Sequence, residues 1–241
     1  MRARVSSGRR QLTLADRALR RRAVVAALTV AAVGAVVTIA AFHPRLATGA
    51  GPIVVAAAGY LPLGAAALYW LHRRGELAEL LRPLRGDIAV AALLAAAMWG
   101  ASKLGVVVLA PEGTERQAWL IRLYSHLSWC SGRPLAGVAI MWVAAFEEIA
   151  WRGFAFRALR AGFGARRAFW GTTVLYALAH LPSAWLLAAE LSGPNPAVVL
   201  AAAFGGAVWG FVTLRSGRLS PAIFAHALYS WAVVEFPLWR L

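Results

Sequence analysis

The sequence consists of seven apolar runs separated by shorter polar segments. Each run has about 20 residues, the length an α-helix needs to cross a hydrocarbon layer of roughly 30 Å. The runs lie near residues 23–42, 50–71, 87–110, 134–155, 170–190, 196–214 and 220–239. Open strands would leave backbone groups unpaired in lipid, so we predict an all-α, polytopic transmembrane helix bundle with about seven spans. We expect the segment 111–133 to form an interfacial helix.

Composition and charge support this prediction and indicate an orientation. Hydrophobic residues make up 61% of the chain, above the roughly 45–50% of soluble domains. Nineteen arginines fall in the N-terminal tail and in the loops after the second, fourth and sixth runs, and five fall on the other side. Cytoplasmic segments are enriched in basic residues, so the N-terminus is predicted to be cytoplasmic.

These features define three segments and a location. Residues 1–22 are predicted to be a basic cytoplasmic tail, and residues 23–133 to be the N-terminal transmembrane helices with a connecting loop. The net charge of +15 lies in loops, which indicates anionic membrane lipid rather than nucleic acid as the partner. The alanine- and arginine-rich composition is typical of a bacterium with a GC-rich genome, so we expect a multi-pass protein of the inner (plasma) membrane.

Thiol chemistry is not expected. Cys130 is the single cysteine, so the chain has no internal disulfide and no thiolate metal site.

The ionisable residues inside the apolar runs are few, and they occur in a regular pattern. Charges within spans are costly and often functional. The spacing of four residues recurs in three different runs and places both members of each pair on one helix face. The pairs are Glu148 with Arg152, Tyr176 with His180, and His226 with Ser230. A bundle would satisfy these polar stripes by turning them toward one interior cavity, which we expect to open toward the cytoplasmic side.

The two adjacent glutamates are predicted to differ in chemistry. Glu148 reaches Arg152 one turn later, and this cation favours its charged form. Glu147 points about 100° away and has no local cation, which makes it the better base. With a histidine facing it, Glu147 would deprotonate a water molecule, and a second histidine with a hydroxyl donor would stabilise an oxyanion.

This pattern resembles the CPBP family of intramembrane glutamic proteases, the CAAX prenyl endopeptidase and bacteriocin-processing group that is also called the ABI family. Its motifs are EExxxR, FxxxH and HxxxN on successive transmembrane helices. The chain matches the first at Glu147, Glu148 and Arg152, and the second at His180 with Tyr176 in place of phenylalanine. It matches the third at His226, where Ser230 replaces the usual asparagine. Residues 134–241 would then be a CPBP-like catalytic core.

The resemblance implies a role for each motif residue. Glu147 and His180 would activate the water, His226 and Ser230 would form the oxyanion site, and Glu148 with Arg152 would support the arrangement. The implied activity is endopeptidase cleavage of a membrane-associated protein or peptide, lipidated and CAAX-like in the family's eukaryotic members, with no cofactor. Ser230 has a shorter donor than asparagine, and losing one oxyanion donor costs roughly 10²–10³ in rate, so reduced activity is expected.

Two other interpretations remain open at this stage. Glu147, His180 and His226 have the composition of a His₂Glu zinc site, which would make the protein a membrane metallopeptidase. This ranks lower because there is no HExxH helix and each ligand would come from a different helix. The second alternative is a catalytically weak or inactive membrane scaffold or immunity protein, or a proton-linked transporter, in which the same residues act as structural contacts or as a relay.

Overall fold

A computed structural model describes residues 13–47 and 49–238 of the chain. The elements in order are α1 Leu14–Ala41, η1 Pro44–Leu46, α2 Gly51–Arg73, α3 Leu77–Leu81, α4 Asp87–Leu109, α5 Gln117–Leu127, α6 Pro134–Glu148, η2 Ile149–Ala155, α7 Phe156–Phe163, α8 Ala165–Ala179, α9 Ser183–Leu186, α10 Ala197–Ser216 and α11 Ser220–Glu235. The predicted all-α class is confirmed, because the described residues contain no strand beyond one isolated bridge between Ala189 and Gly193.

Five helical segments are long and apolar enough to cross a membrane, so this is a multi-pass membrane protein. They are α1, α2, α4, α10 and the continuous helix Pro134–Phe163, which is made of α6, η2 and α7. The prediction of seven spans included two helices that are shorter than expected, α8 with 15 residues and α11 with 16. The structure therefore supports five of the predicted spans by length.

Two helix boundaries differ from the prediction for identifiable reasons. The predicted span 170–190 is wrong, because α8 ends at Ala179 and a turn, α9 and a loop follow. Pro182 has no backbone N–H and disfavours helical geometry in the residue before it. At the other end of the bundle, α1 begins at Leu14, where Thr13 and Asp16 form a capping box. The last part of the predicted tail is thus helical, and residues 1–12 lie outside the described residues.

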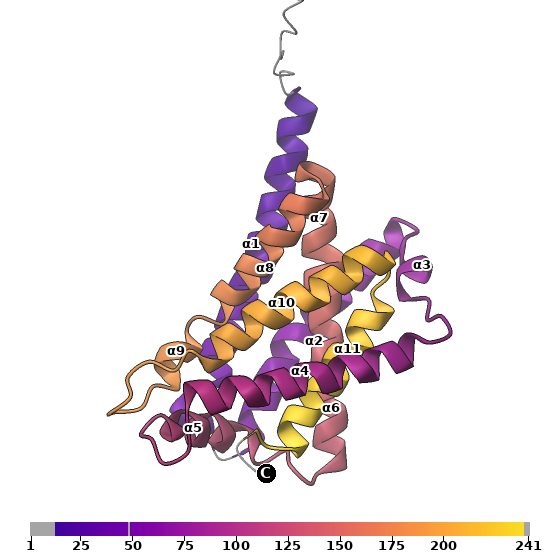
Figure 1. Cartoon of the computed structure of the whole chain (residues 1–241). Coiled ribbons are helices and arrows are strands. Elements are labelled where there is room, and N and C mark those ends of the chain that lie inside the picture. The colour runs from indigo at the N-terminus through magenta and orange to yellow at the C-terminus, as the bar shows by residue number, and fades with distance from the viewer. Residues whose placement is uncertain (1–12, 48, 239–241) are drawn as a thin grey trace, which may run out of the picture.

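The helices pack as two interlocking groups, shown in Figure 1. In the first group α1 contacts α2, α7 and α8, and in the second α11 packs between α4 and α6, while α10 contacts α8. The largest buried cluster joins η2 to α8 through Trp151 and Tyr176, whose rings make an edge contact with centroids 5.1 Å apart. Buried alanines such as Ala222 and Ala225 bring α11 close to its neighbours. The core therefore lies around η2, where the polar residues also lie.

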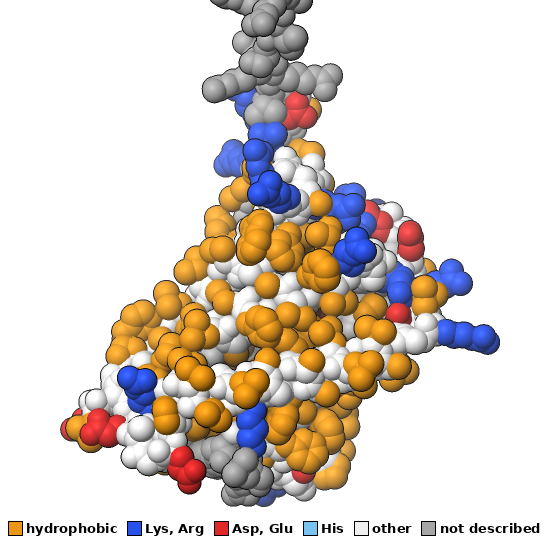
Figure 2. Space-filling view, viewed as in Figure 1, with side chains coloured by type: hydrophobic (Ala, Val, Ile, Leu, Met, Phe, Trp, Pro, Cys, Tyr) orange, Lys and Arg blue, Asp and Glu red, His pale blue; other side chains and the backbone are white. Residues whose placement is uncertain are grey.

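Charged and apolar surfaces are segregated along the molecule. Figure 2 shows hydrophobic side chains over the middle of one face, with Lys and Arg gathered over the end that carries α3 and α7. At this end Glu76 accepts hydrogen bonds from Arg74 and Arg157, at 2.7 and 2.8 Å. Burial alone would raise the pKa of Glu76, but these two hydrogen bonds lower the pKa below its usual value. Glu76 therefore stays ionised at neutral pH and ties the α2–α3 turn to α7.

The segment 111–133 contains the short helix α5, which covers the opposite end of the bundle. Its buried side chains are Trp119, Leu120, Leu123, Tyr124 and His126. The Tyr124 hydroxyl donates to the carbonyl of Val233 at 3.0 Å and accepts from the backbone N–H of Leu238 at 2.8 Å. These contacts fix α5 to the end of α11, so its apolar face is buried against the protein.

Candidate active site

The glutamate pair lies where an α-helix changes into a π-helix. Glu147 and Glu148 are the last residues of α6, and the π-helix η2 begins at Ile149. In a π-helix each N–H bonds five residues back, and such turns occur frequently at functional sites. The stretch FEEIAWRGF carries no proline, glycine pair or other signal from which this turn could be predicted.

Glu148 stands at the centre of a buried ionic network. Its Oε1 accepts hydrogen bonds from Arg152 Nη1 at 2.8 Å and from His226 Nδ1 at 2.9 Å. Arg152 also donates from Nη2 to the carbonyl of Gly206 at 3.1 Å. Glu148 and Arg152 are 0% and 1% exposed. The predicted pairing of Glu148 with Arg152 is confirmed, and His226 on α11 adds a third member.

This network determines which nitrogen of His226 carries a proton. A carboxylate oxygen only accepts, so Nδ1 must donate. The ring is also stacked on Trp209, with ring centroids 5.5 Å apart and planes 19° apart. Both contacts hold the imidazole in one orientation with Nε2 on its far side. Ser230, the expected partner of His226 on α11, lies on the wall of a cavity that His226 does not line.

Glu147 is buried but has no ion-pair partner. It is 8% exposed, and its Oε1 has no hydrogen-bond partner in the described part of the chain. The hydroxyl of Tyr60, on α2, lies close enough to interact electrostatically with this carboxylate. The two adjacent glutamates therefore have different environments. Glu148 accepts hydrogen bonds from Arg152 and His226, whereas Glu147 has no ion pair and lies beside the hydroxyl of Tyr60.

His180 lies at the C-terminal end of α8 and is oriented by the helix itself. Its Nδ1 donates to the carbonyl of Tyr176 at 2.8 Å, which leaves Nε2 as the acceptor of the neutral ring. The predicted pairing of Tyr176 with His180 thus uses the backbone carbonyl, and the two rings lie 4.7 Å apart. The guanidinium of Arg152 lies 4.7 Å from the centre of the Tyr176 ring. Tyr176 therefore separates the ionic network from His180.

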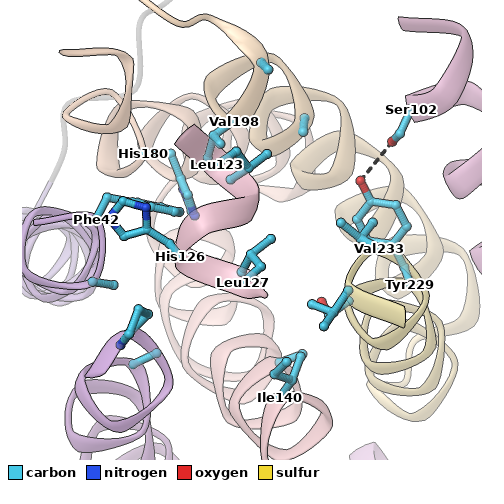
Figure 3. A pocket seen from close by; sticks show the side chains of 18 of the residues that line it. Phe42, Ser102, Leu123, His126, Leu127, Ile140, His180, Val198, Tyr229 and Val233 are labelled. Atoms are coloured by element: carbon cyan, nitrogen blue, oxygen red, sulfur yellow. Dashed lines mark hydrogen bonds between the residues drawn. The ribbon is translucent and has the colours of Figure 1, made fainter. Parts of the chain in front are cut away.

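A cavity of about 660 Å³ brings several of these residues together. Its wall is mostly apolar and includes Glu147, His180 and Ser230, whereas Glu148, Arg152 and His226 lie outside the lining. Figure 3 shows His180 among the side chains of this pocket, together with the hydrogen bond of 2.9 Å between Tyr229 and Ser102. The lining also contains Tyr60 and His126, which the sequence analysis did not single out.

The cavity extends in a direction that differs from the expectation. Its lining comes from α5, α6, the C-terminal parts of α1, α4 and α11, the N-terminal parts of α2 and α10, and the C-terminal end of α8. Apart from α6 and α8, which contribute Glu147 and His180, the lining lies toward one end of the bundle. These parts lie at the end of the bundle opposite α3 and α7 (Figure 1). The site was expected to open toward the arginine-rich, cytoplasmic side. The position of this space depends on how α5 packs over the end of the bundle, and helical periodicity does not specify that packing.

The described residues contain no group of three or more His, Cys, Asp or Glu side chains arranged to hold a metal ion. The residues considered as a His₂Glu set do not meet at one cavity, because Glu147 and His180 line it and His226 does not. The residues present do not fit a zinc site in this arrangement.

Comparison with known proteins locates the site within a family. Residues 129–232 match the family model described as type II CAAX prenyl endopeptidase Rce1-like. No curated protein and no solved structure matches the chain. The matched segment contains the glutamate pair, Arg152, both histidines of the expected motifs and Ser230, but not α1 to α5. Residues 129–232 are therefore an Rce1-like domain of the CPBP family, a family of proteases that includes the CAAX prenyl endopeptidases.

Proposed function

We propose that this protein is an intramembrane endopeptidase that hydrolyses a membrane-associated, lipidated protein or peptide. The observation that carries the proposal is the shared cavity of Glu147 and His180, which come from different helices of the Rce1-like domain. A buried carboxylate oxygen without a hydrogen-bond partner and an imidazole nitrogen on the same cavity wall are groups that can hold and deprotonate a water molecule. The apolar wall of the same cavity suits a lipid chain attached to a peptide.

In the proposed mechanism His180 Nε2 and the Glu147 carboxylate hold a water molecule, and Glu147 takes its proton. The resulting hydroxide attacks the carbonyl carbon of the scissile peptide bond, and the electron pair moves to the carbonyl oxygen. Ser230 on the cavity wall would donate a hydrogen bond to that oxyanion, and His226, one turn earlier on α11, would hold this part of the helix in place. Glu147 then gives its proton to the amine, and the C–N bond breaks. Glu148 and Arg152 would act by fixing His226 in the tautomer that leaves Nε2 on the side away from the network.

Hydrolysis of a prenylated CAAX reporter peptide by the purified protein tests this function. We expect turnover, and we expect it to survive exhaustive treatment with a chelator, because the mechanism uses no metal. Loss of turnover that zinc restores would favour the metallopeptidase alternative instead. Absence of turnover under all conditions with folded protein would contradict the proposal and favour the scaffold interpretation.

We also propose that the chain spans the inner membrane of a bacterium seven times with its N-terminus in the cytoplasm. The arginine-rich end supports this orientation, and α8 and α11 would be the two short spans, accompanied by local thinning of the bilayer. In this orientation the cavity extends toward the outer side. An N-terminal epitope tag should be protected from external protease in intact spheroplasts and cleaved after lysis; cleavage in intact spheroplasts would reverse the orientation.

A further inference from the structure

A third histidine, His126, lines the same cavity from outside the matched domain. It lies in the last turn of α5 and is 4% exposed. Its ring makes an edge contact with Phe42, with centroids 5.7 Å apart, and Figure 3 shows both residues in the pocket. Polar side chains are seldom buried without a partner, so the contacts of both ring nitrogens are informative.

The contacts of Nδ1 determine the tautomer of His126. Nδ1 lies 2.9 Å from the carbonyl oxygen of Arg122 and 3.3 Å from Oγ of Ser125. Ser125 Oγ itself donates to the same carbonyl at 2.7 Å. The carbonyl accepts only, and the serine proton is already engaged, so Nδ1 carries the ring proton and donates. The neutral ring then has its lone pair on Nε2.

Nε2 of His126 is buried and has no hydrogen-bond partner in the described part of the chain. Other buried polar atoms of the described residues also lack a hydrogen-bond partner. Among them, only Oε1 of Glu147 belongs to a residue of the cavity wall. Leaving an acceptor buried and unpaired is unfavourable. The two unpaired acceptors on one apolar cavity therefore indicate that a ligand supplies the missing donors.

We propose that His126 is a substrate-binding residue whose Nε2 accepts a hydrogen bond from a backbone N–H of the bound peptide. This rests on the proposed function, because the ligand is the peptide substrate. A peptide that enters an apolar cavity loses water from its N–H groups and needs acceptors in exchange. A neutral imidazole with a free Nε2 is such an acceptor. The assignment adds α5, which lies outside the Rce1-like domain, to the recognition of the substrate.

Two substitutions separate this role from a structural one. His126→Asn retains an N–H in the position of Nδ1 and removes the acceptor, and we expect the KM for the prenylated CAAX reporter to rise about 5- to 30-fold. We expect kcat to change by less than about threefold. A hydrogen bond that is equally strong in the ground state and in the transition state contributes to KM and not to kcat. His126→Gln places an amide oxygen near Nε2 and should keep most of the affinity. Equal rises in KM for both variants, or lower thermal stability with unchanged KM, would overturn the proposal.

A second measurement does not require turnover. The Glu147→Gln protein in detergent, labelled with ¹⁵N-histidine, should show an upfield shift of the His126 Nε2 resonance when the prenylated peptide is added. Spectra of His126→Asn protein would assign that resonance. An unchanged resonance at saturating peptide would exclude the hydrogen bond. If the resonance shifted but the wild-type protein cleaved no peptide, we would conclude that His126 binds peptide and that the protein is not a peptidase.

Discussion

Replacing Glu147 with glutamine should lower the rate of peptide hydrolysis by about 10²–10⁴-fold, the contribution typical of a general base. Glutamine has nearly the same shape as glutamate but cannot take a proton from water. The fold should be unaffected, because Oε1 of Glu147 makes no hydrogen bond within the described residues. The measurement is the initial rate of cleavage of the lipidated reporter, together with the unfolding temperature of the same preparation.

A matched control for Glu147→Gln is Glu190→Gln, which makes the same chemical change at an exposed position outside the cavity. This variant should retain full activity. If Glu147→Gln cleaved the reporter as fast as the wild type, Glu147 would not be the base and the proposed mechanism would be rejected. If its unfolding temperature dropped markedly, the loss of activity would not report on catalysis.

Glu148→Ala should have the largest effect on stability. The substitution removes the acceptor of two hydrogen bonds and leaves the guanidinium of Arg152 buried without its counter-ion. Breaking a buried ion pair in this way costs about 3–5 kcal/mol in free energy of unfolding. We also expect lower activity, because His226 loses the carboxylate that orients it. Unfolding by heat or denaturant in one detergent would measure the difference.

The control for this prediction is an ion pair at the surface. The side chain of Arg74 is 52% exposed where it pairs with Glu76, so Arg74→Ala should cost no more than about 1 kcal/mol. The double variant Glu148→Ala, Arg152→Met should regain part of the stability lost in Glu148→Ala, because it removes the stranded charge. Equal stabilities of Glu148→Ala and Arg74→Ala would show that the buried network contributes little.

The sequence predicts those features of the site that depend on one helix. The Glu148–Arg152 pair follows from a spacing of four residues, and the early end of α8 follows from Pro182, although hydrophobicity alone extended that helix to residue 190. Contacts between helices are different. The donation from His226 to Glu148 depends on how α11 packs against α6, and helical periodicity does not specify that rotation.

Other features of the site had no local signal. The π-helix η2 has no distinctive local sequence, and most of its residues, including Trp151, are buried in the bundle. The sequence gives no reason to single out His126, because it lies in a segment between predicted spans. It becomes part of the cavity wall only because α5 packs over the end of the bundle. Residues from connecting segments thus contribute to a site whose motifs lie within the helices.

The cavity wall also includes Cys130, the single cysteine of the sequence. Burial raises the pKa of this thiol, opposed by the nearby Arg133, so alkylating reagents will react slowly at neutral pH and faster in alkaline buffer. The natural protein consequently carries one addressable position for a fluorophore or a spin label, beside the space that a ligand would fill. Occupancy of that space can be followed by spectroscopy without engineering a new attachment point.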